Sequence, residues 1–291
     1  MALSDNTRGV LFMNVAMASF TLNDTFMKAA TADLPLSEAI AFRGGVTVVL
    51  LLLLAKAMGI RHWLPEAVDR RPLLLRTVGE LGATAAFLIA LMHMPLANLS
   101  AIMQALPLAM TLTAAVALRE KVGWRRLTAI VVGFFGVLLI VRPGTDGFNA
   151  WSVLGLVAVC FVVLRDLSTR GFSHGLPSVV IAFYAALAVA LMGFAGLALE
   201  DWRAVPVATG LMLAASAVML ILGLLFIVMA TRQGDVALIA PFRYSALLWA
   251  ILLGWLAFGD LPGLWTTLGA TIIVATGLFT YLREYQLARR P

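Results

Sequence analysis

Segments of about 20 apolar residues recur along the whole chain, and they constrain the fold more than any other feature. A helix rises about 1.5 Å per residue, so each segment can cross a hydrocarbon core of roughly 30 Å. The 291 residues are 62% hydrophobic and only 12% charged, which is far more apolar than a soluble domain. We therefore predict an all-α integral membrane protein with ten transmembrane helices, at 9–29, 36–57, 72–92, 96–118, 124–142, 151–169, 177–199, 206–230, 235–258 and 262–282.

The remaining segments are short connections. The longest of them, about 58–71, is too short for a soluble domain. The first apolar run contains Asn14 and Asp24 and lacks a small-residue cleavage site, so we do not expect a cleaved signal peptide. The lone Cys160 can form no internal disulfide, and we expect it to pack against lipid or in the core.

The basic residues predict the orientation in the membrane. With both termini on one side, most of the 21 Lys and Arg residues fall on that side, whereas only Lys28, Arg142 and Arg203 fall on the other. Cytoplasmic loops carry such an excess, so we predict cytoplasmic termini and a multi-pass location in the inner membrane. The bias accounts for the net charge of +6 with the lipid bilayer as partner, and we expect no nucleic acid.

Short motifs recur at a spacing of 141–142 residues. "LND" at 22–24, "LP" at 34–35 and "IAFR" at 40–43 return as "LRD" at 164–166, "LP" at 176–177 and "IAFY" at 181–184. Such self-similarity indicates a tandem duplication, which divides the chain into repeats 1–146 and 147–291. Each repeat holds five spans, an odd number, so the second repeat must enter the membrane in the opposite orientation. Secondary transporters use such inverted repeats for alternating access around a central cavity.

Two prolines lie well inside predicted spans, whereas the others, including Pro72, are expected in connections or at helix ends. Pro107 and Pro241 fall in the fourth and ninth spans, which are equivalent elements of the two repeats. A proline removes a backbone donor and bends a helix, so both are candidates for a kink or a gate. Because Pro107 aligns near Leu247 instead of Pro241, the two kinks need not mirror each other.

Polar and ionisable residues inside spans are expensive, and they usually face a cavity or a partner. Counted from the helix ends, Glu80 and Arg243 lie at one depth, and Asp24, Arg43 and Gln104 form a second polar layer nearer the opposite side. At about 100° per residue, the polar residues of the first and third spans form stripes. We predict a cavity lined by spans one, three, four and nine.

We hypothesise that this cavity binds a small polar organic solute. Arg243 would hold a carboxylate, Glu80 or Asp24 would meet an amino group or a proton, and Tyr244 and Gln104 would set its orientation. Arg243 aligns with Met103 in the first repeat, and this asymmetry favours a role in substrate binding. The candidate substrate-binding residues are Arg243, Tyr244, Glu80, Gln104, Asp24, Thr21, Thr84 and Trp249.

Structural roles for the same residues stay open. Arg243 and Glu80 could form an ion pair with each other. Asp24 could pair with Lys28, and Asp166 with Arg170, because each pair is four residues apart on a helix. Arg43 could be a fixed partner of a neighbouring carboxylate.

Longer motifs resemble a known family over essentially the whole chain. They are "IAFRGG" from 40, "REKVGWRRLTAIVVGFFGVLLIVRPG" from 119, "APFRYSALLWAILLGWLAFGDLP" from 240 and "GATIIVATGLFTYLRE" from 269. These are similar to the EamA family of drug/metabolite transporters, and in style to its YddG-type aromatic amino acid exporters. The resemblance implies ten helices, no cofactor, and export or exchange of small metabolites, often amino acids.

Other function classes fit the sequence less well. There is no HExxH, GxSxG or paired-aspartate metal motif, and the three histidines lie in separate connections or helix ends, so we expect neither an enzyme nor a metal site. A passive channel stays open, as do import, coupling to protons, and other substrates such as a nucleoside, a vitamin or an S-adenosylmethionine-like compound. A ten-helix unit of two repeats can work as a monomer.

Overall fold

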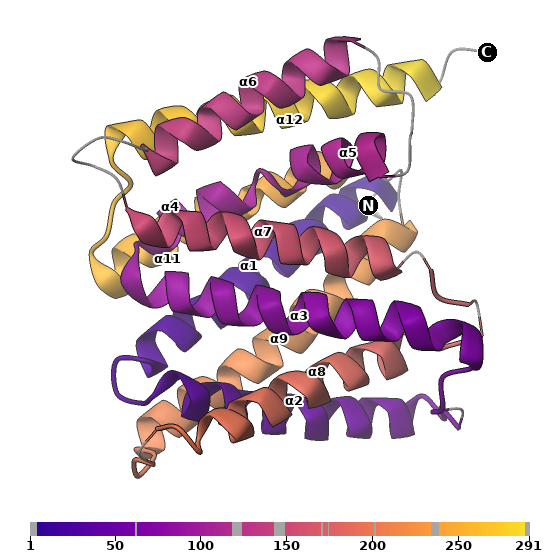
Figure 1. The fold of residues 1–291 in the computed structure, drawn as a ribbon, viewed down its shortest axis with the longest axis vertical. Helices are drawn as coiled ribbons and strands as arrows, with labels where there is room; N and C mark the ends of the chain where they lie inside the picture. The colour runs from indigo at the N-terminus through magenta and orange to yellow at the C-terminus, as the bar shows by residue number, and fades with distance from the viewer. Residues whose placement is uncertain are drawn as a thin grey trace.

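A computed structural model describes residues 5–61, 63–117, 124–142, 149–169, 171–173, 175–200, 202–233 and 239–288. Figure 1 shows that these residues form a bundle of helices lying side by side, and the described part contains no strand. The elements are α1 (Asp5–Ala30), α2 (Leu36–Ala57), α3 (Ala67–His93), α4 (Leu96–Met103), α5 (Leu106–Ala117), α6 (Trp124–Val141), α7 (Ala150–Thr169), α8 (Ser178–Gly196), α9 (Val207–Gln233), the 3-10 helix η1 (Ala240–Tyr244), α11 (Ser245–Phe258) and α12 (Leu264–Ala288).

The helices correspond to the ten predicted spans when α4 is counted with α5, and η1 with α11. Among the described residues, seven helical segments are long and apolar enough to cross a membrane, and α6 and α12 contain shorter apolar stretches. The first helix carries Asp5, Arg8, Asp24 and Lys28, which explains its lower hydropathy. The prediction of an all-α, multi-pass integral membrane protein is confirmed. Part of the ninth predicted span, 234–238, lies outside the described residues.

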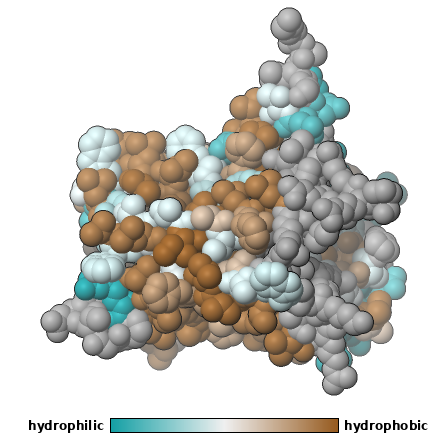
Figure 2. All heavy atoms as spheres, turned by 90° about the horizontal axis from the view of Figure 1, so that it is seen from above, coloured by the Kyte–Doolittle hydropathy of each residue, from teal (hydrophilic) through white to brown (hydrophobic). Residues whose placement is uncertain are grey.

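The surface of the bundle is as apolar as a bilayer requires. Large side chains such as Leu53, Val131 and Leu256 are about 60% exposed, at 59%, 62% and 63%. Figure 2 shows hydrophobic residues spread across the middle of one face of the molecule, with hydrophilic residues toward its edges. Cys160 is also exposed on α7, where lipid would cover it. A water-soluble monomer does not expose so much contiguous apolar surface, so the bilayer must cover it.

Pro72 lies inside the third helix, whereas the sequence predicted it at the start of that helix. The third helix begins at Ala67, so Pro72 occupies its second turn instead of its start. The missing N–H of Pro72 deprives only Val68 of a helical hydrogen bond, close to the end of the helix. The prediction that α3 starts at residue 72 is therefore corrected by one and a half turns.

The fourth and ninth spans are both interrupted, at equivalent positions. The fourth breaks at Gln104 and Ala105, and Pro107 is then the second residue of α5. In the described part of the ninth, the 3-10 helix η1 follows Ile239, has Pro241 as its second residue, and becomes α-helical after Tyr244. A proline is well tolerated in the first turn of a helix, since the N–H there has no partner in the helix. The two interruptions mirror each other although the two prolines do not align.

Four helix pairs make the most extensive contacts, and each joins the first half of the chain to the second. They are α1 with α9, α3 with α7, α2 with α8, and α6 with α12. The predicted equivalents are α1 and α7, α2 and α8, α3 and α9, and α6 and α12. Exchanging each helix for its equivalent converts the α1–α9 pair into the α7–α3 pair. The α2–α8 and α6–α12 pairs remain the same pairs. This is the packing that an inverted repeat would produce.

A specific contact repeats in the same way. Gly82 of α3 lies against the ring of Phe161 in α7, so closely that a Cβ atom on Gly82 would be 2.5 Å from the ring. Gly223 of α9 lies against the ring of Phe20 in α1, with a Cβ distance of 2.6 Å. Adding 141 to 82 and subtracting 141 from 161 gives 223 and 20. The division into repeats 1–146 and 147–291 stays a proposal, and this contact supports it.

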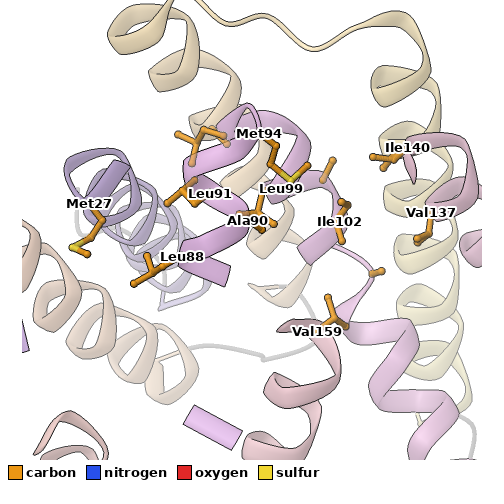
Figure 3. Packing of buried hydrophobic residues seen from close by; sticks show 14 of the residues in the cluster. Met27, Leu88, Ala90, Leu91, Met94, Leu99, Ile102, Val137, Ile140 and Val159 are labelled. Carbon is orange, nitrogen blue, oxygen red and sulfur yellow. The ribbon is translucent and has the colours of Figure 1, made fainter. Parts of the chain in front are cut away.

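The buried core joins the two halves. Its largest cluster contains Met27, Leu91, Leu99 and Ile102 from the first half and Val159 from the second. Figure 3 shows Leu91 and Leu99 close together, with Ile102 and Val159 beside them and Met27 on the neighbouring helix. Both described termini lie at one end of the bundle, at the right of Figure 1, and we call it the terminal end and the other the distal end.

Candidate functional site

The two helix interruptions meet near the middle of the bundle. The side-chain amide of Gln104 donates a hydrogen bond of 3.5 Å to the backbone carbonyl of Tyr244. Gln104 is 9% exposed, and the hydroxyl of Tyr244 lies directly against Gly277 of α12. The structure therefore brings together Gln104 and Tyr244, which the sequence analysis predicted to act at one site.

Arg243 lies at the end of η1, next to this contact, and its side chain is exposed. Among the described residues it has no hydrogen bond and no ion pair within 4 Å. The charged groups that act on it over longer distance are Asp166 and Arg165 of α7. The predicted alternative of an Arg243–Glu80 ion pair is thus not what the described residues form.

Glu80 instead belongs to a set of charges between α3 and α7. Its Oε2 is 3.8 Å from Arg76 Nη2, one turn earlier on α3, and its Oε1 is 3.7 Å from Arg165 Nη1. Arg165 in turn donates from Nε to Oδ1 of Asp166 over 2.8 Å. These side chains are 18–31% exposed, so they are half-buried and lie where lipid cannot solvate them.

A second polar set lies between α1, α2 and α9. Asn23 donates from Nδ2 to Oδ1 of Asp24 over 2.9 Å, and its Oδ1 accepts from Arg43 Nη1 over 3.3 Å and from Ser216 Oγ over 2.8 Å. Arg43 is 7% exposed, and its Nε has no hydrogen-bond partner. Arg43 is therefore held by Asn23, whereas the structural alternative had named a neighbouring carboxylate as its partner.

The two sets are linked electrostatically. Arg43 faces both Asp24 and Glu80, and Arg243 faces Asp166. We call this continuous set of charges the central charged cluster, and it comprises Asp24, Arg43, Arg76, Glu80, Arg165, Asp166 and Arg243. Four arginines face three carboxylates in it. Within the described part of the chain the cluster has one positive charge in excess. Arg43 and Arg243 are its arginines without an ion pair, and of these two Arg43 is hydrogen-bonded to Asn23.

The helices predicted to line a cavity do contact one another. The first helix packs on α3, η1 and α11, and α4 packs on α3 and α11. Thr84 lies one turn beyond Glu80 on α3 and is half-buried. Thr21 is buried, and its hydroxyl donates back to Met17 O within the helix over 2.9 Å.

Trp249 faces a different neighbourhood. It packs against a cluster formed by Met13 and Met17 of α1 and by Ala230 of α9. The structure thus separates Trp249 from the Gln104–Tyr244 contact, and it supplies apolar packing between α11 and α1.

The sequence analysis missed several members of the cluster. Arg76 and Arg165 are among the basic residues counted for the cytoplasmic side, and in the structure both pair with Glu80. A signal was present, because Arg165 occupies in "LRD" the position that Asn23 occupies in "LND". Asn23 itself and Ser216 were missed because uncharged polar residues are common in membrane helices.

Lys28 also has partners other than the one predicted. Its Nζ donates to the carbonyl of Met94 over 2.6 Å and lies 3.9 Å from Oδ2 of Asp260. Asp24 is therefore not its ion-pair partner. Asp166 pairs with Arg165, and Arg170 lies outside the described residues. In the described part of the chain, no three His, Cys, Asp or Glu side chains come together in a way that could hold a metal ion.

Comparison with known proteins shows which transporters the chain is similar to. Residues 7–142 match the EamA-like transporter family. The chain is 28% identical to the pseudopaline exporter CntI of Pseudomonas aeruginosa over 91% of this chain and 93% of that protein. It is 29% identical to a riboflavin transporter of Vibrio cholerae over 97% and 96%, and 25% identical to an S-adenosylmethionine uptake transporter of Rickettsia conorii over 99% and 97%.

A solved crystal structure has the same fold. It superposes with a TM-score of 0.65 at 17% sequence identity, covering 98% of this chain and 100% of the other. The similarity therefore extends over both halves. Over residues 7–142 this chain is similar to the EamA-like transporter family, and with these relatives it is a membrane transporter of small molecules and not an enzyme.

Proposed function

We propose that the chain is a secondary carrier for a small organic metabolite with a carboxylate group, most simply an amino acid, which it exports across the inner membrane by alternating access. The observation that carries this proposal is the state of Arg243. It is an exposed arginine in the middle of a membrane bundle, and it has no ion pair among the described residues. An unpaired charge at that depth is expensive, so a substrate anion is its natural partner.

The geometry around Arg243 suits a carboxylate. A guanidinium offers several N–H donors in a planar fork, which a carboxylate accepts in pairs. Arg243 lies at the junction of η1 and α11, beside the carbonyl of Tyr244 and the amide of Gln104. Backbone groups at such a junction lack part of their helical hydrogen bonding, and they can contact solute or water. In this proposal Tyr244 and Gln104 orient the solute, and Pro107 and Pro241 allow the interrupted helices to bend.

An amino group would be met by Asp24 before Glu80. Glu80 already faces two arginines at 3.7 and 3.8 Å, which neutralise it. The carboxylate of Asp24 accepts a hydrogen bond from neutral Asn23, and Arg43 acts on it over a longer distance. Thr21 and Thr84 would contribute to the walls near these residues.

Alternating access requires two states related by exchange of the repeats. The repeated Gly–Phe contact and the pairing of α1 with α9 and α3 with α7 support such an exchange. The excess of basic residues at the terminal end supports cytoplasmic termini.

The relatives define the alternatives. They include an exporter for pseudopaline and transporters for riboflavin and S-adenosylmethionine, the last named for uptake. A vitamin, an S-adenosylmethionine-like compound and the direction of import are thus the competing versions of the same function. A passive channel is the competing class.

The test is transport by purified protein in liposomes, with a panel of amino acids, riboflavin and S-adenosylmethionine. We expect saturable uptake and counterflow of one carboxylate-bearing compound, because a channel cannot drive counterflow. Arg243→Ala should abolish that flux, and Arg243→Lys should weaken it. Arg232→Ala, which removes an exposed arginine at the end of α9, is the matched control and should transport normally. Full transport by a well-folded Arg243→Ala protein would overturn the assignment.

A further inference from the structure

Two hydrogen-bonded contacts close opposite ends of the bundle. At the distal end, Thr209 of α9 donates from Oγ1 to Oδ2 of Asp33, in the α1–α2 connection, over 2.8 Å. At the terminal end, Ser173 of the α7–α8 connection donates to Asp69 of α3, from its backbone N to Oδ1 over 2.8 Å and from Oγ to Oδ2 over 3.0 Å. Figure 1 shows the two connections at opposite ends of the molecule.

The two contacts occupy equivalent places in the two halves. Asp69 is the third residue of α3, and Thr209 is the third residue of α9. Asp33 and Ser173 each lie shortly before a Leu-Pro pair that leads into the next helix, at 34–35 and 176–177. Exchanging the halves therefore places one contact on the other within about two residues. The two contacts differ in which element carries the carboxylate. At the distal end it is Asp33 of the connection, and at the terminal end it is Asp69 of the helix.

Each contact has one buried partner and one more accessible partner. Asp69 is 1% exposed and Thr209 is 2% exposed, whereas Asp33 is exposed and Ser173 is half-buried. The neighbouring Leu34 and Leu176 are 3% and 6% exposed. Each end has a second hydrogen bond between the two halves of the chain. Glu38 accepts from the backbone N of Arg203 over 3.2 Å at the distal end, and Tyr184 donates to the carbonyl of Trp63 over 3.2 Å at the terminal end. Separating these elements at either end would break the contact at that end.

We propose that Asp33–Thr209 and Asp69–Ser173 are the latches of two gates that open in alternation. A hydrogen bond to a charged carboxylate, with one partner buried, favours the closed state of its own end. Both latches are formed in the present structure. Loss of one latch should shift the population toward the state that is open at that end.

The alternation rests on the proposed carrier function, whereas the latches themselves can be tested without a substrate. Two reporter variants, Leu34→Cys and Leu176→Cys, place a thiol at the distal and the terminal end in a Cys160→Ser background. The measurement is the rate at which a maleimide labels each reporter in purified protein. Both reporters should be slow when the two latches are intact, since both leucines are buried.

Breaking each latch should affect its own end. Asp69→Ala should speed labelling of Leu176→Cys about tenfold without speeding labelling of Leu34→Cys. Thr209→Val, which keeps the shape and removes the donor, should do the reverse. Thr209→Ser keeps a hydroxyl and should stay near the parent rate. Ser173→Ala, which leaves the backbone donor in place, should give a smaller effect than Asp69→Ala.

Two outcomes would overturn the proposal. One is that either latch variant exposes both reporters equally, which would mean general loosening of the fold. The other is that neither variant changes either rate. If Arg243 proves not to bind substrate, the labelling results would still be expected, because they do not depend on a substrate. The two proposals can therefore fail separately.

Discussion

Gln104 and Tyr244 stand 140 residues apart in the chain, and they touch through the 3.5 Å hydrogen bond from the Gln104 amide to the Tyr244 carbonyl. Each marks the interruption of its own span. In the proposed inverted repeat, equivalent residues meet only where the axis that relates the two halves passes between them. The contact therefore places the two helix breaks at the centre of the molecule, beside Arg243.

The first prediction concerns this contact. Gln104→Leu removes the donor while keeping a similar volume, so transport should fall severalfold. Thermal stability should fall by only about 1 kcal/mol or less, because the bond is long. Initial uptake rates and a melting curve in detergent would measure the two effects. A variant with unchanged uptake would show that Gln104 only fills space.

The second prediction uses the repeated glycine contacts. A Cβ atom at Gly82 or Gly223 would overlap the ring of Phe161 or Phe20, so each alanine variant should lose about 1–3 kcal/mol of stability. Gly45 of α2 has nothing within 4 Å of an added Cβ, and Gly45→Ala is the control, with an expected gain of about 0.5–1 kcal/mol. Melting temperatures of the three variants would decide. Phe161→Leu should partly rescue Gly82→Ala, and similar stability in all three would contradict the prediction.

The third prediction concerns Glu80. Glu80→Gln leaves Arg76 and Arg165 facing each other without their shared carboxylate. We expect a loss of about 2 kcal/mol, since the groups are half-buried and their charges are partly screened. Adding Arg76→Gln should restore part of this loss. If the two substitutions prove additive in a double-mutant cycle of melting measurements, the residues are not coupled.

The fourth prediction concerns orientation. Protease-cleavable tags at both ends of the chain should resist protease added outside spheroplasts and be cut after permeabilisation. A cleavage site inserted at Val205, in the connection before α9, should be cut from outside. Cutting of either terminal tag in intact spheroplasts would refute cytoplasmic termini.

The fold was predictable because the apolar runs are long and their ends are well marked. The span predicted at 36–57 has the same bounds as α2, and 124–142 differs from α6 by one residue. The error at Pro72 arose because helices extend beyond the hydrocarbon layer, where their residues need not be apolar. The last helix likewise continues to Ala288, past the predicted end at 282.

The site was predictable in part. The depth of a residue can be counted along its own helix, and this count grouped Glu80 with Arg243. Which side chain it faces depends on the rotation and neighbours of several helices, which no local pattern reports. Glu80 therefore pairs with Arg165 of α7, and Lys28 pairs with Asp260, and both partners lie far along the chain. Gln104 and Tyr244 are in contact, although the count of depth had placed Gln104 in the other polar layer, with Asp24 and Arg43.

The pairing of α1 with α9 and of α3 with α7 has a consequence for biogenesis. Helices enter the bilayer in the order of synthesis, yet α1 and α3 make their main contacts with helices of the second half. Until α7 and α9 have been inserted, Asn23, Asp24 and Glu80 must remain in the membrane without their partners Ser216 and Arg165. A chain truncated after its first half should therefore be degraded by membrane quality control. The helices should pack stably only when the whole chain has been inserted.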